Sequence, residues 1–303
     1  MNRVRFLALA VFLAPPAFAQ DVHKHDGMPG MEHDAMPISA KAQREIAGVE
    51  QSVSPLGTTD AARAAGFRPV FGWIPTMGVH WVSPPRMTRE KQLDLSAPAN
   101  LMFSKINGRD SLVGAAYAYY APAAESARPP LFDGAPSWHE HAQLAPAGQT
   151  LVMLHVWFVP SPDGPFAGTN PNLPFWAIGL DAPDAARMHD PAYATRIRRA
   201  TLALAEIADS TSLFPALANR PAVRAIIVPR RDTIRALIPE LKAAQQANDV
   251  ARFERAIDRA GSQWDGIYAA YLANAPTAQG KRRITEHVAM LMSDHGDHGG
   301  MEK

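Results

Sequence analysis

The sequence predicts an α+β fold, with an antiparallel β-sandwich or barrel over residues 66–180 followed by a helical bundle over residues 181–292. Two observations support this prediction. The first region is rich in short apolar segments that alternate with a period of two and are separated by turn residues, of which Asn107-Gly108 is the clearest. The second region has apolar residues at three- and four-residue intervals, most clearly over residues 249–273.

The first 19 residues are typical of a secretion signal. Arg3 and Arg5 precede the apolar run 6–14, and Ala17-Phe18-Ala19 is a small-x-small cleavage sequence. No apolar stretch is long enough to cross a bilayer. We therefore expect a periplasmic or secreted protein with no membrane span after signal cleavage. The chain has no cysteine, which excludes disulfides and thiolate ligands.

Residues 20–38 are predicted to be a disordered tail, and residues 293–303 form a second tail. The first tail is polar, interrupted by glycine and proline, and offers little apolar surface to offset the entropy of ordering it. Both tails contain soft or borderline metal donors, namely His23, His25, Met28, Met31, His33 and Met36 in the first and His295 and His298 in the second. Thioethers suit Cu(I), while imidazoles suit Cu(II) and other late divalent ions.

The segment Gly27-Met28-Pro29-Gly30-Met31-Glu32-His33-Asp34-Ala35-Met36 resembles the Met/His-rich segments of periplasmic copper-resistance proteins. The resemblance implies that metal ions, and copper as Cu(I) or Cu(II) above all, are bound, and that other periplasmic copper-handling proteins are partners. It is compositional and says nothing of the fold between the tails. Zinc or another divalent ion is the alternative cargo.

Residues 39–65 are predicted to form two short helices. The first covers residues 39–52, and the second covers residues 61–65 after the capping sequence 58–60. The strands of the β-rich region are expected at residues 69–74, 79–82, 100–106, 111–120, 150–159 and 175–180. A turn at residues 162–164 follows the fifth of them.

The stretch from Trp138 to Trp157 contains the candidate metal site of the folded region. His139 and His141 lie two residues apart and share a face if this segment is extended. If it pairs with the following strand, a shift of one residue decides whether His155 joins them or points away. Three converging imidazoles would suit a transition metal ion. The alternative is that these histidines hydrogen-bond to the backbone at a polar rim.

His80 is a fourth candidate ligand, although a histidine at a strand end near a turn commonly meets solvent. The stretches Pro75-Thr76-Met77-Gly78-Val79-His80 and Leu154-His155-Val156-Trp157, with Asn170-Pro171, also resemble a group of secreted bacterial proteins with no assigned activity. That resemblance covers roughly residues 66–180. It implies that His80 and His155 belong to one site, and it implies no chemistry.

The helices of the second region are expected at residues 194–209, 221–228, 233–246, 249–273 and 281–292. Pro229 and Pro239 are expected to interrupt them. The pairs His189-Asp190 and Glu286-His287 are interpreted as surface residues, because neighbours on a helix point about 100° apart.

The composition and the motifs favour a binding protein over an enzyme. With 30 Lys and Arg against 29 Asp and Glu, and with no long basic run, nucleic acid is not an expected partner. No nucleophile elbow, phosphate loop, dinucleotide fingerprint or His-Glu-x-x-His motif occurs. Glu140 could act as a base beside a metal, but alternation turns it away from His139 and His141.

The prediction is therefore a periplasmic metal-binding protein, most plainly one that binds or handles copper. Two alternatives stay open. One is a metal-dependent enzyme that uses the histidines of the β-rich region. The other is a module for a small apolar ligand, since five of the six tryptophans lie within residues 66–180.

Overall fold

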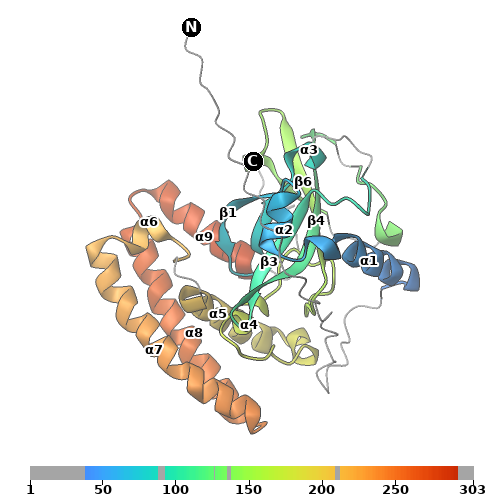
Figure 1. Cartoon of the computed structure of the whole chain (residues 1–303). Helices are drawn as coiled ribbons and strands as arrows, with labels where there is room; N and C mark the ends of the chain where they lie inside the picture. Colours follow the sequence, from blue (N-terminus) through green and yellow to red (C-terminus); the bar gives the residue numbers. More distant parts are fainter. Residues whose placement is uncertain (1–37, 88–92, 126, 135–137, 209–211, 293–303) are drawn as a thin grey trace, which may run out of the picture. The chain divides into compact units, whose positions relative to one another are not determined.

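The computed structural model describes residues 38–87, 93–125, 127–134, 138–208 and 212–292, and it has an α+β fold (Figure 1). Its strands are β1 (Arg68–Ile74), β2 (Gly78–Val82), β3 (Asn100–Ile106), β4 (Arg109–Pro122), β5 (His139–His141) and β6 (Gln149–Trp157). They form one antiparallel sheet in the order β1-β2-β3-β4-β6-β5. All described residues belong to one compact unit, His33–Lys303.

The sheet is open rather than closed. Its order begins at β1 and ends at β5, and these two strands do not pair with each other among the described residues. The expectation of a closed barrel or a two-sheet sandwich is therefore not confirmed, although the antiparallel pairing is. The predicted turn at Asn107-Gly108 joins β3 to β4, and both residues have the positive φ that a tight hairpin turn of this type requires.

Two N-terminal helices, α1 (Ala40–Val53) and α2 (Thr59–Ala64), pack on one face of the sheet. Each begins at a capping side chain: Ser39 accepts a hydrogen bond from the amide of Ala42, and Thr58 accepts one from the amide of Ala61. Buried residues of α1 pack against the β4 and β6 side chains that point to this face, namely Ala115, Tyr117, Leu154 and Val156. The opposite face of the sheet is therefore the one left for other contacts.

One predicted strand is wrong. Residues 175–180 were expected to be extended, but Leu173–Ala177 forms the short helix α4. Pro174 stands in its first turn, where the missing amide costs no hydrogen bond. The apolar run is buried all round, which is the case in which alternation cannot separate a strand from a short helix. Leu173 and Trp176 pack with Met102 and Trp157 of the sheet.

The remaining helices are α3 (Pro84–Met87), α5 (Pro191–Ala208), α6 (Pro215–Ala218), α7 (Pro221–Gln246), α8 (Val250–Asn274) and α9 (Ala278–Met292), with 3₁₀ turns at Ser54–Leu56, Phe132–Gly134, Ala142–Leu144 and Ala186–His189. The interruption expected at Pro229 and Pro239 is wrong, because α7 is continuous through both. Buried residues spaced along α7, from Val223 to Ala244, join the large core cluster that also contains the buried face of α8. This packing offsets the two amide hydrogen bonds that proline removes.

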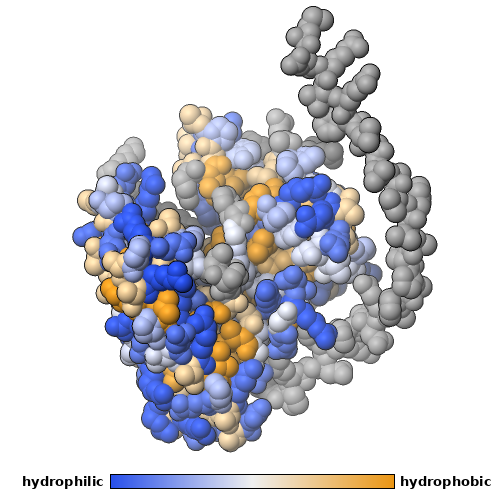
Figure 2. Space-filling model, turned by 60° about the vertical axis from the view of Figure 1, so that its left-hand side comes forward, coloured by the Kyte–Doolittle hydropathy of each residue, from blue (hydrophilic) through white to orange (hydrophobic). Residues whose placement is uncertain are grey.

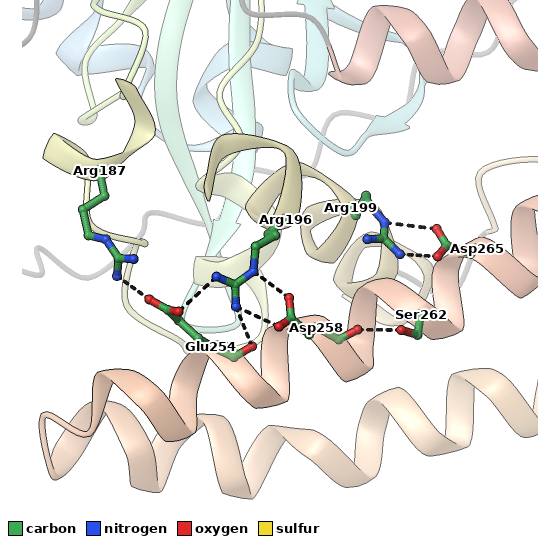
Figure 3. A network of polar contacts seen from close by, with 7 residues as sticks. All are labelled: Arg187, Arg196, Arg199, Glu254, Asp258, Ser262 and Asp265. Atoms are coloured by element: carbon green, nitrogen blue, oxygen red, sulfur yellow. Dashed lines mark hydrogen bonds and ion pairs between the residues drawn. The ribbon is translucent and has the colours of Figure 1, made fainter. Parts of the chain in front are cut away.

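Arginines of α5 and the preceding turn bind carboxylates of α8 (Figure 3). Glu254 accepts from Arg187 at 2.5 Å and from Arg196 at 3.0 Å. Arg196 also donates to both carboxylate oxygens of Asp258, at 2.7 and 2.8 Å. Shared bidentate contacts of this kind orient the two helices more firmly than a single exposed ion pair would.

The surface contains both hydrophilic and hydrophobic residues (Figure 2). Hydrophilic and hydrophobic residues are interspersed over the face drawn in Figure 2, and the exposed large hydrophobic side chains include Ile226, Val228 and Val250. Within the described ranges, no helix combines the length and the apolar content that crossing a membrane would need.

Candidate metal centre

Four histidines lie on the face of the sheet that α1 and α2 leave uncovered. His80 is in β2, His155 is in β6, and His139 and His141 are in β5. β5 pairs with β6 so that His139 lies opposite Met153, two residues before His155. Because side chains two apart in a strand share a face, this register brings His155 to the side of His139 and His141. We call this side of the sheet the histidine face.

His80 and His155 approach each other closely, since their Nε2 atoms lie 3.2 Å apart. Strands β3 and β4 separate the two strands to which they belong. On β4 the residues of this face include Gly114 and Ala116, and Ala116 lies directly opposite His155. These short side chains leave room for the two imidazoles to approach each other over the sheet.

The orientation of His155 is fixed by the backbone. Its Nδ1 lies 2.8 Å from the carbonyl oxygen of Gly168. A carbonyl only accepts, so Nδ1 donates its hydrogen to Gly168. In the neutral ring, Nε2 then has a free electron pair, and this pair faces Nε2 of His80.

The loop that contains Gly168 is held from several sides. The indole nitrogen of Trp157 donates to the carbonyl oxygen of Ala167 at 2.7 Å. The amide of Asn170 donates to the carbonyl oxygen of Thr76 at 2.7 Å. Earlier in the same loop, Asp163 lies 3.3 Å from Arg198 of α5. The carbonyl that orients His155 therefore belongs to a segment that is held both by the turn between β1 and β2 and by α5.

Both histidines of the pair are neutral at physiological pH. Burial, reinforced by the nearby His141, lowers the pKa of His80 to about 4. Burial and the neighbouring imidazoles of His139 and His80 hold the pKa of His155 well below its usual range. His80 is 6% exposed and His155 is 1% exposed, so the idea that His80 meets solvent is wrong. Neutral imidazole is the form that binds a metal ion.

His139 and His141 lie beside this pair. The ring centroid of His139 is 4.8 Å from that of His155 and 5.0 Å from that of His141. His139 is buried, whereas His141 is partly exposed. In the ranges that the structure covers, no three His, Asp or Glu side chains are already placed to hold one ion. The four predicted histidines of the folded region are thus gathered on one face, and the Nε2 atoms of His80 and His155 lie 3.2 Å apart.

Glu140 points away from the histidine face, as alternation predicts. It lies opposite Val152 and pairs with Arg128. The two pairs interpreted as surface residues, His189-Asp190 and Glu286-His287, differ in exposure. His189 is exposed as expected, but His287 is only partly exposed, and its ring centroid lies 5.6 Å from that of Phe214. Burial lowers the pKa of His287. Its interpretation as a surface residue is therefore wrong.

An aromatic pocket is lined by side chains of the other face of the sheet and by Ala177 and Ala208 of the helices. Trp81 and Phe103, which alternate with His80 and Met102 along their strands, line it together with Trp73. Its volume is about 180 Å³. Sites for drug-sized ligands usually measure about 300–1,000 Å³, so this pocket is small for a bound organic molecule.

The metal donors of the two tails lie outside the described residues; they are His23, His25, Met28, Met31, His33, Met36, His295 and His298. Sequence reasoning also missed Met102 and Met153, which lie on the histidine face opposite His80 and His139. In the sequence, only the alternation of their strands could have indicated these two residues, and alternation shows which residues share a face with the histidines only once the strand register is known. The sequence could not indicate the role of the Gly168 carbonyl, because every residue has a backbone carbonyl.

Comparison with known proteins adds no assignment: no family model, no curated protein and no solved structure matches this chain.

Proposed function

We propose that this chain is an exported metal-binding protein that handles copper, and that the His80–His155 pair is the centre of its folded site. The observation on which this rests is the separation of 3.2 Å between their Nε2 atoms. Two imidazole nitrogens that bind one tetrahedral ion at about 2.0–2.1 Å are roughly 3.3 Å apart. The pair is thus spaced as two ligands of one ion are.

The surroundings of His155 support the same proposal. Histidines that bind metals usually donate their second N–H to a carbonyl or carboxylate, which fixes the ring and the tautomer. The bond from His155 Nδ1 to Gly168 has this arrangement and leaves Nε2 as the ligand atom. Since both rings are neutral, an ion would not have to displace a proton from an imidazolium.

Copper is favoured as cargo by the donors of the tails, which combine thioethers with imidazoles. Imidazoles alone also suit zinc and other late divalent ions, so these are the rival cargo of the folded site. An enzyme at this site would need substrate to reach the ion. His80, His139 and His155 are each at most 6% exposed, which favours holding an ion over turning over a substrate.

The test is copper retention by the mature chain and by the double variant His80→Gln/His155→Gln. Each sample is loaded with copper, desalted and analysed for metal per chain. We expect the double variant to lose one high-affinity ion per chain, because the folded site loses two ligands. It should lose no more than that, because both tails are unchanged. His189→Gln, at an exposed histidine, is the matched control and should retain the wild-type amount.

Thermal unfolding of each variant checks that the fold is retained. Equal copper content in wild type and a folded double variant would remove the pair from the proposal. Deleting residues 20–37 and 293–303 tests the tails separately, and we expect a further loss of copper stoichiometry. If neither deletion changes it, the tails have no part in binding.

A further inference from the structure

The His80–His155 pair supplies two ligands, whereas ions bound in proteins generally need three or four. No third His, Asp or Glu side chain within the described ranges completes the set as it stands. A thioether is the remaining kind of donor that this cysteine-free chain offers to a soft ion. The question is therefore whether a methionine lies on the histidine face between the strands of His80 and His155.

Met102 is the candidate. In the register of β2 and β3 it lies directly opposite His80, on the histidine face. It is 0% exposed. Its own opposite neighbour on β4 is Gly114, which in turn lies opposite Trp157, two residues from His155. Met102 thus lies in the sheet between the strand of His80 and the strand of His155.

The direction of the Met102 side chain is also fixed. A Cβ placed on Gly114 would lie 2.5 Å from the Cε atom of Met102, so the thioether side chain extends across the glycine toward β6. Glycine at this position provides the room for it. The two histidines flank this part of the sheet, since His80 lies opposite Met102 and His155 lies opposite Ala116, the next residue of β4 on this face.

We propose that the thioether of Met102 is a ligand of the folded site and that the site therefore prefers Cu(I) to a divalent ion. This inference rests on the proposed function above. Imidazole and thioether together form a neutral, soft ligand set that suits Cu(I), whereas zinc in proteins is bound by thiolate, imidazole and carboxylate. It also specifies which of the two oxidation states the folded site holds.

The lack of negative charge on the histidine face points the same way. The residues that the register places on this face of β2 to β6, between Gly78 and Trp157, include no Asp or Glu. The cost of desolvating an ion grows with the square of its charge, so a buried site without carboxylates penalises a divalent ion more than a monovalent one.

The test compares wild type with Met102→Leu, a change that keeps the apolar volume and removes the sulfur. In chains that lack residues 20–37 and 293–303, so that the tails do not compete, Cu(I) affinity is measured by competition with bathocuproine disulfonate at less than one equivalent of copper, and Zn²⁺ affinity is measured by titration. We expect Cu(I) affinity to fall by about tenfold or more, the scale for losing one contribution to a metal site, with Zn²⁺ affinity nearly unchanged. Met188→Leu, at a buried methionine of the helical core, should change neither value.

The copper-edge X-ray absorption spectrum of the chain without residues 20–37 and 293–303 provides a second readout, because the tail thioethers cannot contribute sulfur to it. We expect a copper–sulfur shell at half an equivalent of Cu(I), and its loss when Met102→Leu is added. A spectrum with nitrogen neighbours only, or equal Cu(I) affinity in both proteins, would overturn the role of Met102. If metal binding depends on His80 and His155 but not on Met102, only this inference fails; if it depends on neither histidine, the proposed function fails as well.

Discussion

His80 and His155 are 75 residues apart in the sequence, yet their Nε2 atoms lie 3.2 Å from each other. Gly114 and Ala116, in the strand next to that of His155, lie on the same face of the sheet and have no bulky side chain. Because Gly168 takes the Nδ1 hydrogen of His155, the contact without metal must be a hydrogen bond from His80 Nε2–H to His155 Nε2. An ion between the rings would need both Nε2 electron pairs, so His80 has to change its tautomer when metal binds.

This tautomer change is the first prediction. Without metal, His155 has its hydrogen on Nδ1 and His80 has it on Nε2. On addition of zinc or Cu(I), both diamagnetic, we expect His80 to shift to the Nδ1–H form while His155 does not. Long-range ¹H–¹⁵N correlation spectra distinguish the two tautomers of each ring.

The matched control for these spectra is His189, an exposed histidine that should show averaged tautomers and no change with metal. A His155 ring with its hydrogen on Nε2 in the metal-free protein would contradict the predicted arrangement. So would a His80 ring whose tautomer is the same before and after saturation.

The second prediction concerns pH and the metal-free fold. Burial lowers the pKa of His80 from 6.5 to about 4. Between these values the unfolded chain binds a proton that the folded chain does not, so stability falls as pH falls through this window and His80 adds no further loss below it. At about 1.4 kcal/mol for each unit, His80 contributes on the order of 3 kcal/mol. His155, whose pKa is also lowered by burial, acts in the same direction.

Urea unfolding between pH 7.5 and pH 4.5, with a chelator present, measures this loss. His80→Gln should flatten the dependence of the free energy of unfolding on pH, because one of the titrating groups is gone. His189→Gln should leave it as in wild type. A wild-type stability that does not change across this range would show that the pair is not buried in its neutral form.

Much of this fold follows from local sequence, and the site follows only in part. The Asn107-Gly108 turn and the His139-x-His141 alternation are local patterns. The first correctly predicted a hairpin turn, and the second correctly predicted an extended segment. The meeting of His80 with His155 depends on the order of four strands, which no single stretch encodes.

The errors have physical reasons too. The run at residues 175–180 was expected to be a strand because a buried helix and a buried strand are both apolar throughout, and α4 was missed there. Pro229 was expected to break a helix, but the packing of α7 in the core outweighs one lost hydrogen bond. Tertiary burial decides both cases, and a single sequence does not show it.

The third prediction is that Gly114→Ala destabilises the sheet. The new Cβ would lie 2.5 Å from Met102 Cε and 2.6 Å from the carbonyl oxygen of Val156. The methionine can move, but the carbonyl belongs to the β4–β6 pairing and cannot. Overpacking of this kind costs about 1–3 kcal/mol, to be measured by urea unfolding.

Gly48→Ala is the control for this substitution. Gly48 lies within α1, and nothing is within 4 Å of the position that its Cβ would occupy. Alanine there should raise stability by about 0.5–1 kcal/mol, because it favours the helix. If Gly114→Ala matches wild type within error, the close approach of Met102 to β4 is wrong.

The fourth prediction concerns a buried carboxylate of the helical region. The side chain of Glu206 is 0% exposed and pairs with Arg231 of α7. It also accepts from the hydroxyl of Tyr271 at 2.9 Å. Arg231→Met would leave the charge buried without its cation, which typically costs about 3–5 kcal/mol. Chemical denaturation should detect this as a large drop in the midpoint.

Arg235 provides the comparison on the same helix. It pairs with Asp232 at 2.8 Å, and both side chains are more than half exposed, at 52% and 64%. Arg235→Met should therefore change stability by less than about 0.5 kcal/mol. Adding Glu206→Gln to Arg231→Met removes the uncompensated charge, so the double variant should recover part of the loss. Equal costs for Arg231→Met and Arg235→Met would mean that water reaches Glu206 and that burial does not determine the strength of this pair.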